Sequence, residues 1–340
     1  MRKLRVVQVG CGGRAQTHMA SMLSSGAVDL VGICDLDAAK LKDSAAKYNV
    51  ARTYSNMQEM IQKEKPELVD ICTPPMIRAS IVEPAIKAGA PAILIEKPIA
   101  LTPSESRRMV ELGQDRLIAV NTQYQWMPHW QRFWGLLKER ALGDVRLLRA
   151  STGCNILEQG PHDLDLALKA ARLSGLPNPE WVLASCCGIE RYGQFPIPAD
   201  TSATVGMGEA RLHFNAGPSA PPVPGEKVIY LHQQVEVIGN KGRLWVSLNQ
   251  GWTLWLDGKF ESGRTNWPDD DKSSQPALYV NLRDSLHAGT WRDFPTRVET
   301  AGQISDVMFA CYASALGGGR VKLPAEFPDS LIERVETLAK

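Results

Sequence analysis

Short apolar runs alternate with amphipathic stretches along the first 123 residues of the chain. The apolar runs have the length and branched composition of buried strands, and they occur at Leu4–Val9, Leu30–Cys34, Leu68–Thr73, Ile93–Ile95 and Leu117–Val120. Helical periodicity lies between them, at Gln16–Ser24, 36–48, Ile77–Ala88 and Ser104–Leu112. Wholly apolar strands that alternate with helices are typical of a parallel sheet covered on both faces. The pattern therefore predicts a doubly wound α/β domain over residues 1–123.

The pattern changes from about residue 124, where strand-like runs dominate. They occur at Val145–Thr152, Trp181–Ile189, Ser202–Met207, Val228–Ile238, Arg243–Val246 and Trp252–Leu256. Helical stretches are expected at Trp130–Arg140, Pro161–Leu173 and Thr300–Ala315, and a loop or insert at the proline-rich Gly217–Gly225. Successive strands with few helices favour an α+β domain with a large, mostly antiparallel sheet, which we place at residues 124–340.

Composition and charge exclude several classes of protein. Lysine and arginine number 38 and aspartate and glutamate 37, so the net charge of +1 argues against a nucleic-acid partner. Hydrophobic residues make up 44% of the 340 residues, as in ordinary globular proteins. No apolar run approaches the roughly 20 residues that span a bilayer, so we expect no membrane association. The seven cysteines lack zinc-site spacing, so we expect reduced thiols, no metal and a cytoplasmic protein.

A glycine-rich loop joins the first predicted strand to the first predicted helix. Its sequence, Gly10-Cys11-Gly12-Gly13-Arg14-Ala15, fits G-x-G-x-x-[GA], in which glycines permit a tight turn and let the backbone approach a pyrophosphate. Asp35 ends the second strand 20 residues beyond Ala15 (35 − 15), the separation expected for a carboxylate that accepts the ribose hydroxyls of NAD. A glycine turn without a ligand, and a helix-capping role for Asp35, are the alternatives. The position of the loop favours a dinucleotide site.

The same aspartate bears on the choice between NAD and NADP. A carboxylate at Asp35 repels a 2′-phosphate, and Leu36 and Asp37 supply no arginine to bind one. We therefore expect NAD as the cofactor and consider NADP the less favoured one.

A lysine follows the fourth predicted strand, where Ile93–Ile95 runs directly into Glu96-Lys97-Pro98. The carboxyl ends of strands in open α/β sheets are where ligands bind. Pro98 restricts Lys97 to an extended backbone and can take the cis form. A surface ion pair between Glu96 and Lys97 is the simpler interpretation, but adjacent residues of a strand point to opposite faces. We expect Lys97 to lie over the cofactor crevice, close to the nicotinamide.

Together with other segments, these residues resemble the glucose–fructose oxidoreductase/inositol dehydrogenase (Gfo/Idh/MocA) family. The resemblance rests on VGCGGRAQTH (9–18), CTPP (72–75), IKAGAPAILIEKPIALTPSES (86–106), GPHDLDLA (160–167), VIGNKGRL (237–244) and ACYASALGGGRVKLP (310–324). The Glu-Lys-Pro segment after a glycine-ended helix is the most specific of them. The resemblance implies a Rossmann domain that binds a dinucleotide, followed by an open-faced sheet domain through which dimers or tetramers assemble.

The helix expected around Pro161–Leu173 carries a second group of candidate residues, and Glu158 lies on the turn before it if Pro161 is the first helical residue. Glu158, His162 and Asp165 are spaced i, i+4, i+7 on one helical face, and periodicity alone favours a solvated polar face there. The resemblance reverses that preference, because the family has a carboxylate-x-x-x-His-x-x-Asp segment that faces the nicotinamide. It implies that His162 acts with Lys97 in catalysis and that Glu158 and Asp165 bind substrate, although most relatives have aspartate in place of Glu158.

The chemistry agrees with these residue types. Oxidation of a secondary alcohol requires a group that takes the hydroxyl proton, and histidine titrates near neutrality. The Lys97 ammonium can hold the hydroxyl and stabilise negative charge on its oxygen. The hydride chemistry belongs to the cofactor.

Three residues bear on the resemblance in other ways. Arg78 stands where relatives often carry a histidine, and we interpret it as a surface helix residue. Tyr124 lies where many relatives have paired arginines, and we place it in the substrate pocket. His18 lies on the first helix, where relatives commonly have histidine, and we expect it to pack there.

The predicted cofactor site comprises Gly10, Gly12, Gly13, Arg14, Ala15, Asp35, Thr73, Pro74, Glu96 and Lys97. The leading hypothesis is an NAD-dependent dehydrogenase or reductase of a sugar, sugar derivative or cyclitol. One alternative is an NAD-dependent glycoside hydrolase that oxidises, eliminates, adds water and reduces again, and another is a non-catalytic sensor of NAD and sugar. The expected partners are a small carbohydrate or cyclitol and further copies of the chain, in a homodimer or homotetramer formed through residues 145–256.

Overall fold

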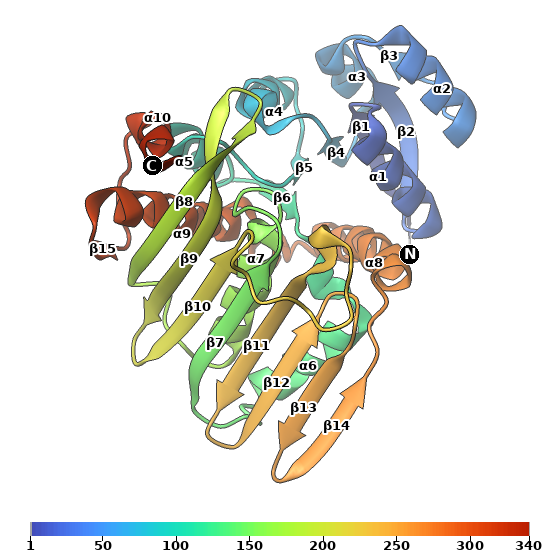
Figure 1. Ribbon diagram of the computed structural model, residues 1–340. Helices are drawn as coiled ribbons and strands as arrows, with labels where there is room; N and C mark the ends of the chain where they lie inside the picture. The colour runs from blue at the N-terminus through green and yellow to red at the C-terminus, as the bar shows by residue number, and fades with distance from the viewer. Residues whose placement is uncertain (1, 340) are drawn as a thin grey trace. The chain divides into compact units, whose positions relative to one another are not determined.

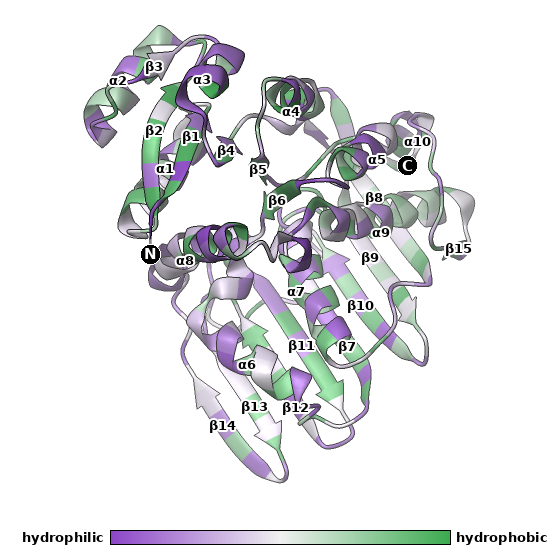
Figure 2. Ribbon diagram, turned by 180° about the vertical axis from the view of Figure 1, so that it is seen from behind, coloured by the Kyte–Doolittle hydropathy of each residue, from purple (hydrophilic) through white to green (hydrophobic). Residues whose placement is uncertain are grey.

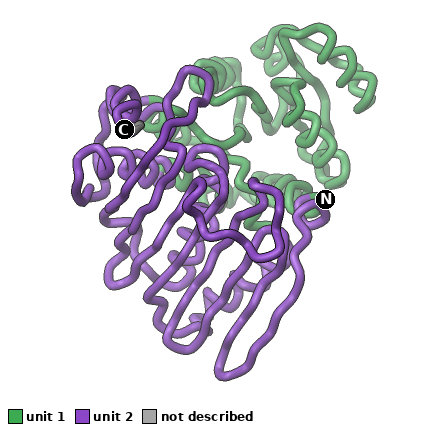
Figure 3. Tube along the Cα trace, in the orientation of Figure 1, with its two compact units in different colours: residues 1–101, 105–126, 272–302 green, residues 102–104, 127–271, 303–340 purple. Residues whose placement is uncertain are grey.

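The computed structural model describes residues 2–339, which form two compact units, each built from separate stretches of chain (Figure 3). The first contains Met1–Leu101, Glu105–Trp126 and Lys272–Gly302, and the second contains Thr102–Ser104, Met127–Asp271 and Gln303–Lys340. The division expected between residues 123 and 124 lies close to the crossing after Trp126. The return of Lys272–Gly302 to the first unit is not foreseen by the sequence pattern.

The first unit is built on a six-stranded parallel sheet of order β3-β2-β1-β4-β5-β6 (Figure 1). Its strands are β1 (Leu4–Val9), β2 (Val28–Cys34), β3 (Thr53–Tyr54), β4 (Leu68–Ile71), β5 (Ala92–Glu96) and β6 (Leu117–Asn121). Every residue of β4, β5 and β6 is buried, which explains why these strands are apolar along nearly their whole length. The predicted doubly wound parallel sheet is confirmed.

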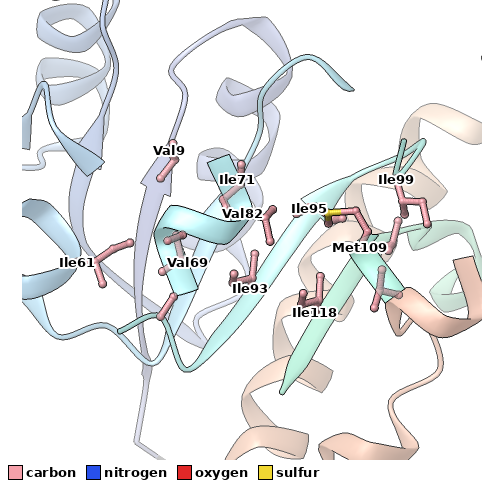
Figure 4. Packing of buried hydrophobic residues seen from close by; sticks show 14 of the residues in the cluster. Val9, Ile61, Val69, Ile71, Val82, Ile93, Ile95, Ile99, Met109 and Ile118 are labelled. Carbon is pink, nitrogen blue, oxygen red and sulfur yellow. The ribbon is translucent and has the colours of Figure 1, made fainter. Parts of the chain in front are cut away.

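Helices cover both faces of this sheet. They are α1 (Gly13–Ser24), α2 (Ala38–Tyr48), α3 (Met57–Glu64), α4 (Arg78–Lys87), α5 (Pro103–Leu112) and α8 (Trp267–Ala288), with the 3-10 turns η1 (Pro75–Ile77), η2 (Gln123–Trp126) and η4 (Trp291–Asp293). One apolar cluster packs Ile93 of β5 with Val82 of α4 and Met109 of α5 (Figure 4). A second packs Leu94 with Leu278 of α8. Because adjacent strand residues point to opposite faces, the two clusters lie on opposite sides of the sheet.

The second unit contains a nine-stranded sheet of order β14-β13-β12-β11-β7-β10-β9-β8-β15. Its strands are β7 (Val145–Thr152), β8 (Trp181–Tyr192), β9 (Phe195–Met207), β10 (Ala210–Ala216), β11 (Gln233–Gly239), β12 (Gly242–Ser247), β13 (Trp252–Leu256), β14 (Lys259–Gly263) and β15 (Val321–Lys322). Neighbouring strands are antiparallel except for β7 and β10. The predicted large, mostly antiparallel sheet is confirmed.

Helices α6 (Pro128–Lys138) and α7 (Gly160–Leu173) cover one face of this sheet (Figure 2). The remaining helical elements that begin in the second unit or enter it are α9 (Val298–Gly317), α10 (Ser330–Arg334), η3 (Ile229–Leu231) and η5 (Val335–Ala339). The opposite face carries exposed aromatic side chains, among them Trp255 and Phe260. The expected loop at Gly217–Gly225 runs over that face, where the Pro221 carbonyl accepts a hydrogen bond from Gln234 Nε2 at 2.8 Å.

Two predicted strands of the second unit are wrong in extent. The run expected at Ser202–Met207 belongs to β9, which begins at Phe195. The run Val228–Ile238 begins with the turn η3, and its strand β11 starts only at Gln233. The apolar residues Val228, Ile229 and Tyr230 are exposed and belong to the segment before β11, not to the sheet.

Candidate functional site

The glycine loop between β1 and α1 has the geometry of a tight turn. Gly10 has a φ of +91°, and a Cβ at this position would lie 2.4 Å from the carbonyl oxygen of Cys72. Only glycine fits there without displacing the backbone. Gly12 is the N-cap of α1, and the first N–H groups of a helix have no acceptor within it. This end of α1 can therefore bind a pyrophosphate.

A cavity of about 590 Å³ opens beside this loop in the first unit. Five of the predicted cofactor residues line it, namely Gly10, Gly12, Asp35, Thr73 and Pro74. Apolar side chains from α3 and from the η1–α4 segment complete much of the wall. A largely apolar wall with a few polar groups is the usual lining of a cofactor site.

The Asp35 carboxylate is held in place at the carboxyl end of β2. Its Oδ2 accepts the backbone N–H of Cys11 at 2.6 Å, and its Oδ1 accepts that of Asp37 at 2.8 Å. The alternative role of helix cap belongs to Asp37, whose Oδ1 accepts the N–H groups of Ala39 and Lys40. Asp35 is therefore positioned beside the cavity and does not cap α2.

A second predicted cofactor residue, Glu96, lies at the centre of a buried polar cluster. Its Oε1 accepts hydrogen bonds from Arg14 Nε at 2.7 Å and Asn121 Nδ2 at 2.8 Å, and His18 Nε2 lies 2.8 Å from the same oxygen. Its Oε2 accepts the backbone N–H of Lys97 at 3.2 Å. Glu96 thus connects the phosphate loop to the backbone of Lys97.

Histidine 18 is fully buried between two carboxylates, and the expectation that it simply packs is incomplete. Its Nδ1 lies 3.0 Å from Asp70 Oδ2, and its Nε2 faces Glu96. Burial alone lowers the pKa of His18, but Asp70 and Glu96 outweigh it and raise that pKa to about 9. Burial raises the pKa of Glu96, but Arg14 and His18 bring it well below its usual range. These groups therefore form a charged network at neutral pH.

Helix α8 completes this network with two residues one turn apart. Tyr279 donates its hydroxyl proton to Asp70 Oδ2 at 2.6 Å, and Gln275 Oε1 accepts a hydrogen bond from Arg14 Nη2 at 3.2 Å. Neither residue is predicted from the sequence. The informative feature is Asp70, an acid inside the apolar strand Leu-Val-Asp-Ile, because a buried carboxylate requires partners.

Arg78 is buried, so its interpretation as a surface residue is wrong. The side chain is 1% exposed, and its guanidinium donates hydrogen bonds to the carbonyl oxygens of Thr73, at 2.9 Å, and of Pro98. The Lys97–Pro98 peptide bond is cis, as the sequence allowed. Arg78 therefore joins the segments that follow β4 and β5.

One group of three described residues has donor atoms close enough for a metal ion. Atoms of His18, Cys72 and Glu96 lie within 4.8 Å of one another. Both nitrogens of His18 already face carboxylates, and burial raises the pKa of the Cys72 thiol. The contacts of His18 with Asp70 and Glu96 therefore explain why these three residues lie close together.

In the second unit, α7 carries the predicted His162 and Asp165. The helix packs on β7, β10 and β11, and both side chains are nearly fully buried. The solvated face that periodicity favours is therefore wrong for these two residues. Glu158 is exposed in the turn that precedes the helix, where the Asn155 side chain accepts its backbone N–H at 2.9 Å.

Other ionisable groups on α7 are also desolvated. Burial lowers the pKa of Lys169 to about 8, and its ammonium lies 4.6 Å from the centre of the Trp134 ring. Burial raises the pKa of Asp163 well above its usual range. Such shifts in pKa are common near functional sites, but neither residue is predicted from the sequence as part of one.

The candidate residues divide between the two units. Lys97 and the buried Tyr124 belong to the first unit, and His162 and Asp165 belong to the second. The meeting of Lys97 and His162 at one substrate hydroxyl stays a prediction.

Residues 4–122 match the model of the Gfo/Idh/MocA family, described as an oxidoreductase family with an NAD-binding Rossmann fold. The chain is therefore similar to this family through its first unit. The match covers the phosphate loop, Asp35 and the Glu96-Lys97-Pro98 segment, which carry the geometry described above.

Two curated relatives resemble the chain over part of its length. A D-apiose dehydrogenase of Paraburkholderia graminis is 28% identical over 145 residues, which are 42% of this chain and 38% of that protein. A D-glucoside 3-dehydrogenase of Escherichia coli is 25% identical over 150 residues, 43% of this chain and 42% of that protein. The chain thus spans about two fifths of the length of these relatives.

The similarity to solved structures extends over nearly the whole chain. An oxidoreductase from Agrobacterium radiobacter, solved with NAD+, L-tartaric acid and magnesium, has a TM-score of 0.79 at 19% identity, over 94% of this chain and 98% of that one. This similarity shows that both units share the fold of that protein. Within residues 2–339, we find no helix with the length and apolarity needed to cross a bilayer.

Proposed function

We propose that this protein is an NAD(H)-dependent oxidoreductase that transfers a hydride between nicotinamide and a secondary hydroxyl of a sugar, sugar derivative or cyclitol. The observation that carries the proposal is the cavity beside the phosphate loop, with the carboxylate of Asp35 held at its edge by two backbone N–H groups. The names of the relatives, D-apiose dehydrogenase and D-glucoside 3-dehydrogenase, support the substrate class.

In this proposal, residues of the chain move the hydroxyl proton and orient the substrate. NAD, when bound, accepts or supplies the hydride. In the oxidation direction, His162 takes the hydroxyl proton at a ring nitrogen, and the Lys97 ammonium holds the hydroxyl oxygen as negative charge develops on it. Glu158, Asp165 and Tyr124 orient the other hydroxyls of the substrate. The desolvation of α7 supports this role, because charges act more strongly where water is excluded.

We infer that NAD is preferred to NADP. Asp35 is anchored beside the cavity and repels a 2′-phosphate, whereas hydroxyls of the adenosine ribose can donate to it. Lys40 also lines the cavity, but its ammonium pairs with Asp37 at 3.1 Å.

We also propose that the open face of the nine-stranded sheet pairs with a second copy of the chain. Trp255 and Phe260 are 55% and 57% exposed on this face, beside a hollow lined by Trp245 and the Pro221 loop. Aromatic side chains that are exposed together on an uncovered sheet face often mark an interface.

A turnover screen with purified protein tests the proposed activity. The protein is incubated with NAD and sugars, sugar acids, cyclitols and aryl glycosides, and NADH and free aglycone are measured together. Accumulation of NADH with an oxidised product supports the proposal. Release of aglycone without net NADH would assign the protein to the glycoside hydrolase alternative, and binding of NAD without turnover would favour a sensor.

A further inference from the structure

The buried ionic network of the first unit has a high free-energy cost, because its charged side chains are removed from water. Asp70 and His18 are both 0% exposed, and Glu96 is 6% exposed. Moving such charges out of water costs several kcal/mol each, and apolar residues in their place often stabilise a protein as well or better. Stability alone therefore does not explain the network, which leads toward the predicted catalytic lysine.

A continuous series of hydrogen bonds runs from α8 to Lys97. Tyr279 donates to Asp70 at 2.6 Å, and Asp70 faces Nδ1 of His18 at 3.0 Å. Nε2 of His18 faces Glu96 Oε1 at 2.8 Å, and Glu96 Oε2 accepts the Lys97 backbone N–H at 3.2 Å. Asp70, His18 and Glu96 each make polar contacts with the group before and the group after them in the series. The orientation of one side chain therefore determines that of the next.

We propose that Tyr279 is a positioning residue for Lys97, acting through Asp70, His18 and Glu96. The role rests on the proposed function only in that Lys97 is the residue positioned. Without the hydroxyl of Tyr279, Asp70 loses a donor and can turn away from Nδ1 of His18. His18 then holds Glu96 less firmly, and the carboxylate that bonds the Lys97 backbone gains freedom.

The surroundings of His18 restrict it to this role. Its ionisable neighbours are Asp70 from β4, Glu96 from β5, Tyr279 from α8 and Cys72, which follows β4. Arg14 joins from α1 through Glu96. Two carboxylates and two basic groups balance in charge, so a change at Tyr279 disturbs orientation more than net charge.

Hydrogen exchange at the Lys97 amide tests the proposal without any substrate. Tyr279→Phe removes one hydroxyl and keeps the ring in its apolar cluster with Leu94 and Leu278. We expect the Lys97 amide to exchange at least about tenfold faster in this variant, while the amides of β2 keep their rates. Tyr48→Phe is the matched control, because its hydroxyl donates to the Gln16 carbonyl at 2.8 Å, outside the network. Unchanged protection of the Lys97 amide in Tyr279→Phe would overturn the proposal.

A double-mutant cycle tests the route through Asp70. With a substrate found in the turnover screen, we expect Tyr279→Phe to lower kcat about tenfold and to change the Kd of NAD less than about threefold. Asp70→Asn should have an effect of similar size, and the double variant should be no slower than the slower single variant, because both act on one route. If the fold-losses in kcat of the two single variants multiply in the double variant, Tyr279 and Asp70 act independently, and the proposed route is contradicted. If no substrate is found, the proposed function fails while the exchange experiment still decides the positioning role.

Discussion

The carboxylate of Asp35 cannot easily turn away from a cofactor, because both of its oxygens are bonded to backbone N–H groups. We expect NAD to bind at least about tenfold tighter than NADP, a difference of about 1.4 kcal/mol. Asp35→Ala should narrow this ratio by removing the repulsion of the 2′-phosphate. Calorimetric Kd values for both cofactors measure it. Glu111→Ala is the control that should leave the ratio unchanged, because this carboxylate is exposed on α5 and pairs with Arg108 away from the cavity. Equal Kd values in the unmodified protein would contradict the prediction.

At His162, a catalytic role and a packing role predict different results. If it is the base, His162→Ala loses about 10²–10⁴ in turnover with little change in NAD affinity. Lys97→Ala should lose a comparable amount. If the buried ring only packs, the variant loses melting temperature and keeps its turnover per folded molecule. Both quantities should be measured on the same sample, and near-normal turnover of well-folded His162→Ala would remove this residue from the mechanism.

The raised pKa of His18 predicts how stability depends on pH. The pKa is 6.5 in the unfolded chain and about 9 in the folded one, so the native state binds more protons between these values. The contribution of His18 to the free energy of unfolding is therefore fully present below pH 6.5, declines as pH rises and is lost above about 9. Urea titrations across this range should show the decline, and His18→Gln should flatten it. If the free energy of unfolding of His18→Gln has the same dependence on pH, then groups other than His18 cause the decline.

At the scale of elements, Arg78 fastens the start of α4 to the segments after β4 and β5. Arg78→Leu leaves the carbonyl oxygens of Thr73 and Pro98 without these bonds, and we expect the free energy of unfolding to fall by about 2–4 kcal/mol. Arg108→Leu is the control, because its ion pairs with Glu83 and Glu111 are exposed and should contribute less than about 1 kcal/mol. Equal losses in both urea titrations would contradict the role assigned to Arg78.

Elements with strong apolar periodicity could be predicted from the sequence, and elements with interrupted patterns could not. The strands of the parallel sheet are apolar because both of their faces are covered. Helix α8 has Pro276 in its interior and three consecutive aspartates, Asp269 to Asp271, near its start, so its sequence looks like a loop. It forms because one side of it, with Leu278 and Leu282, packs on the parallel sheet.

The residues of the candidate site also divide into those that the sequence could predict and those that it could not. Gly10 and Asp35 lie at fixed places relative to β1 and β2, so local spacing was enough to predict them. Tyr279 reaches His18 across 261 residues, and no local pattern shows such a contact. Arg78 looked like a surface residue because a charged residue in a helix is usually exposed, and its burial depends on two carbonyl oxygens that only the folded chain brings together.

At the scale of the whole molecule, the open sheet predicts assembly. We expect a dimer or tetramer in sedimentation velocity at micromolar concentration, formed through residues 145–256. Trp255→Glu places a charge on the open face and should shift the protein toward the monomer. Leu23→Glu changes an exposed leucine of α1 and should leave the assembly intact. A monomeric unmodified protein would contradict the proposed interface.

The return of Lys272–Gly302 to the first unit has a consequence for how the protein is made. Domains usually fold as units during synthesis, beginning at the amino terminus. Here the strands β1 to β6 leave the ribosome long before α8, whose Leu278 and Leu282 cover one side of their sheet. The nascent chain must therefore carry an uncovered apolar surface while strands β7 to β14 of the larger sheet are translated. A gene fragment ending at Trp126 would encode all six strands without this cover, so it is a poor choice for expressing the cofactor-binding half alone.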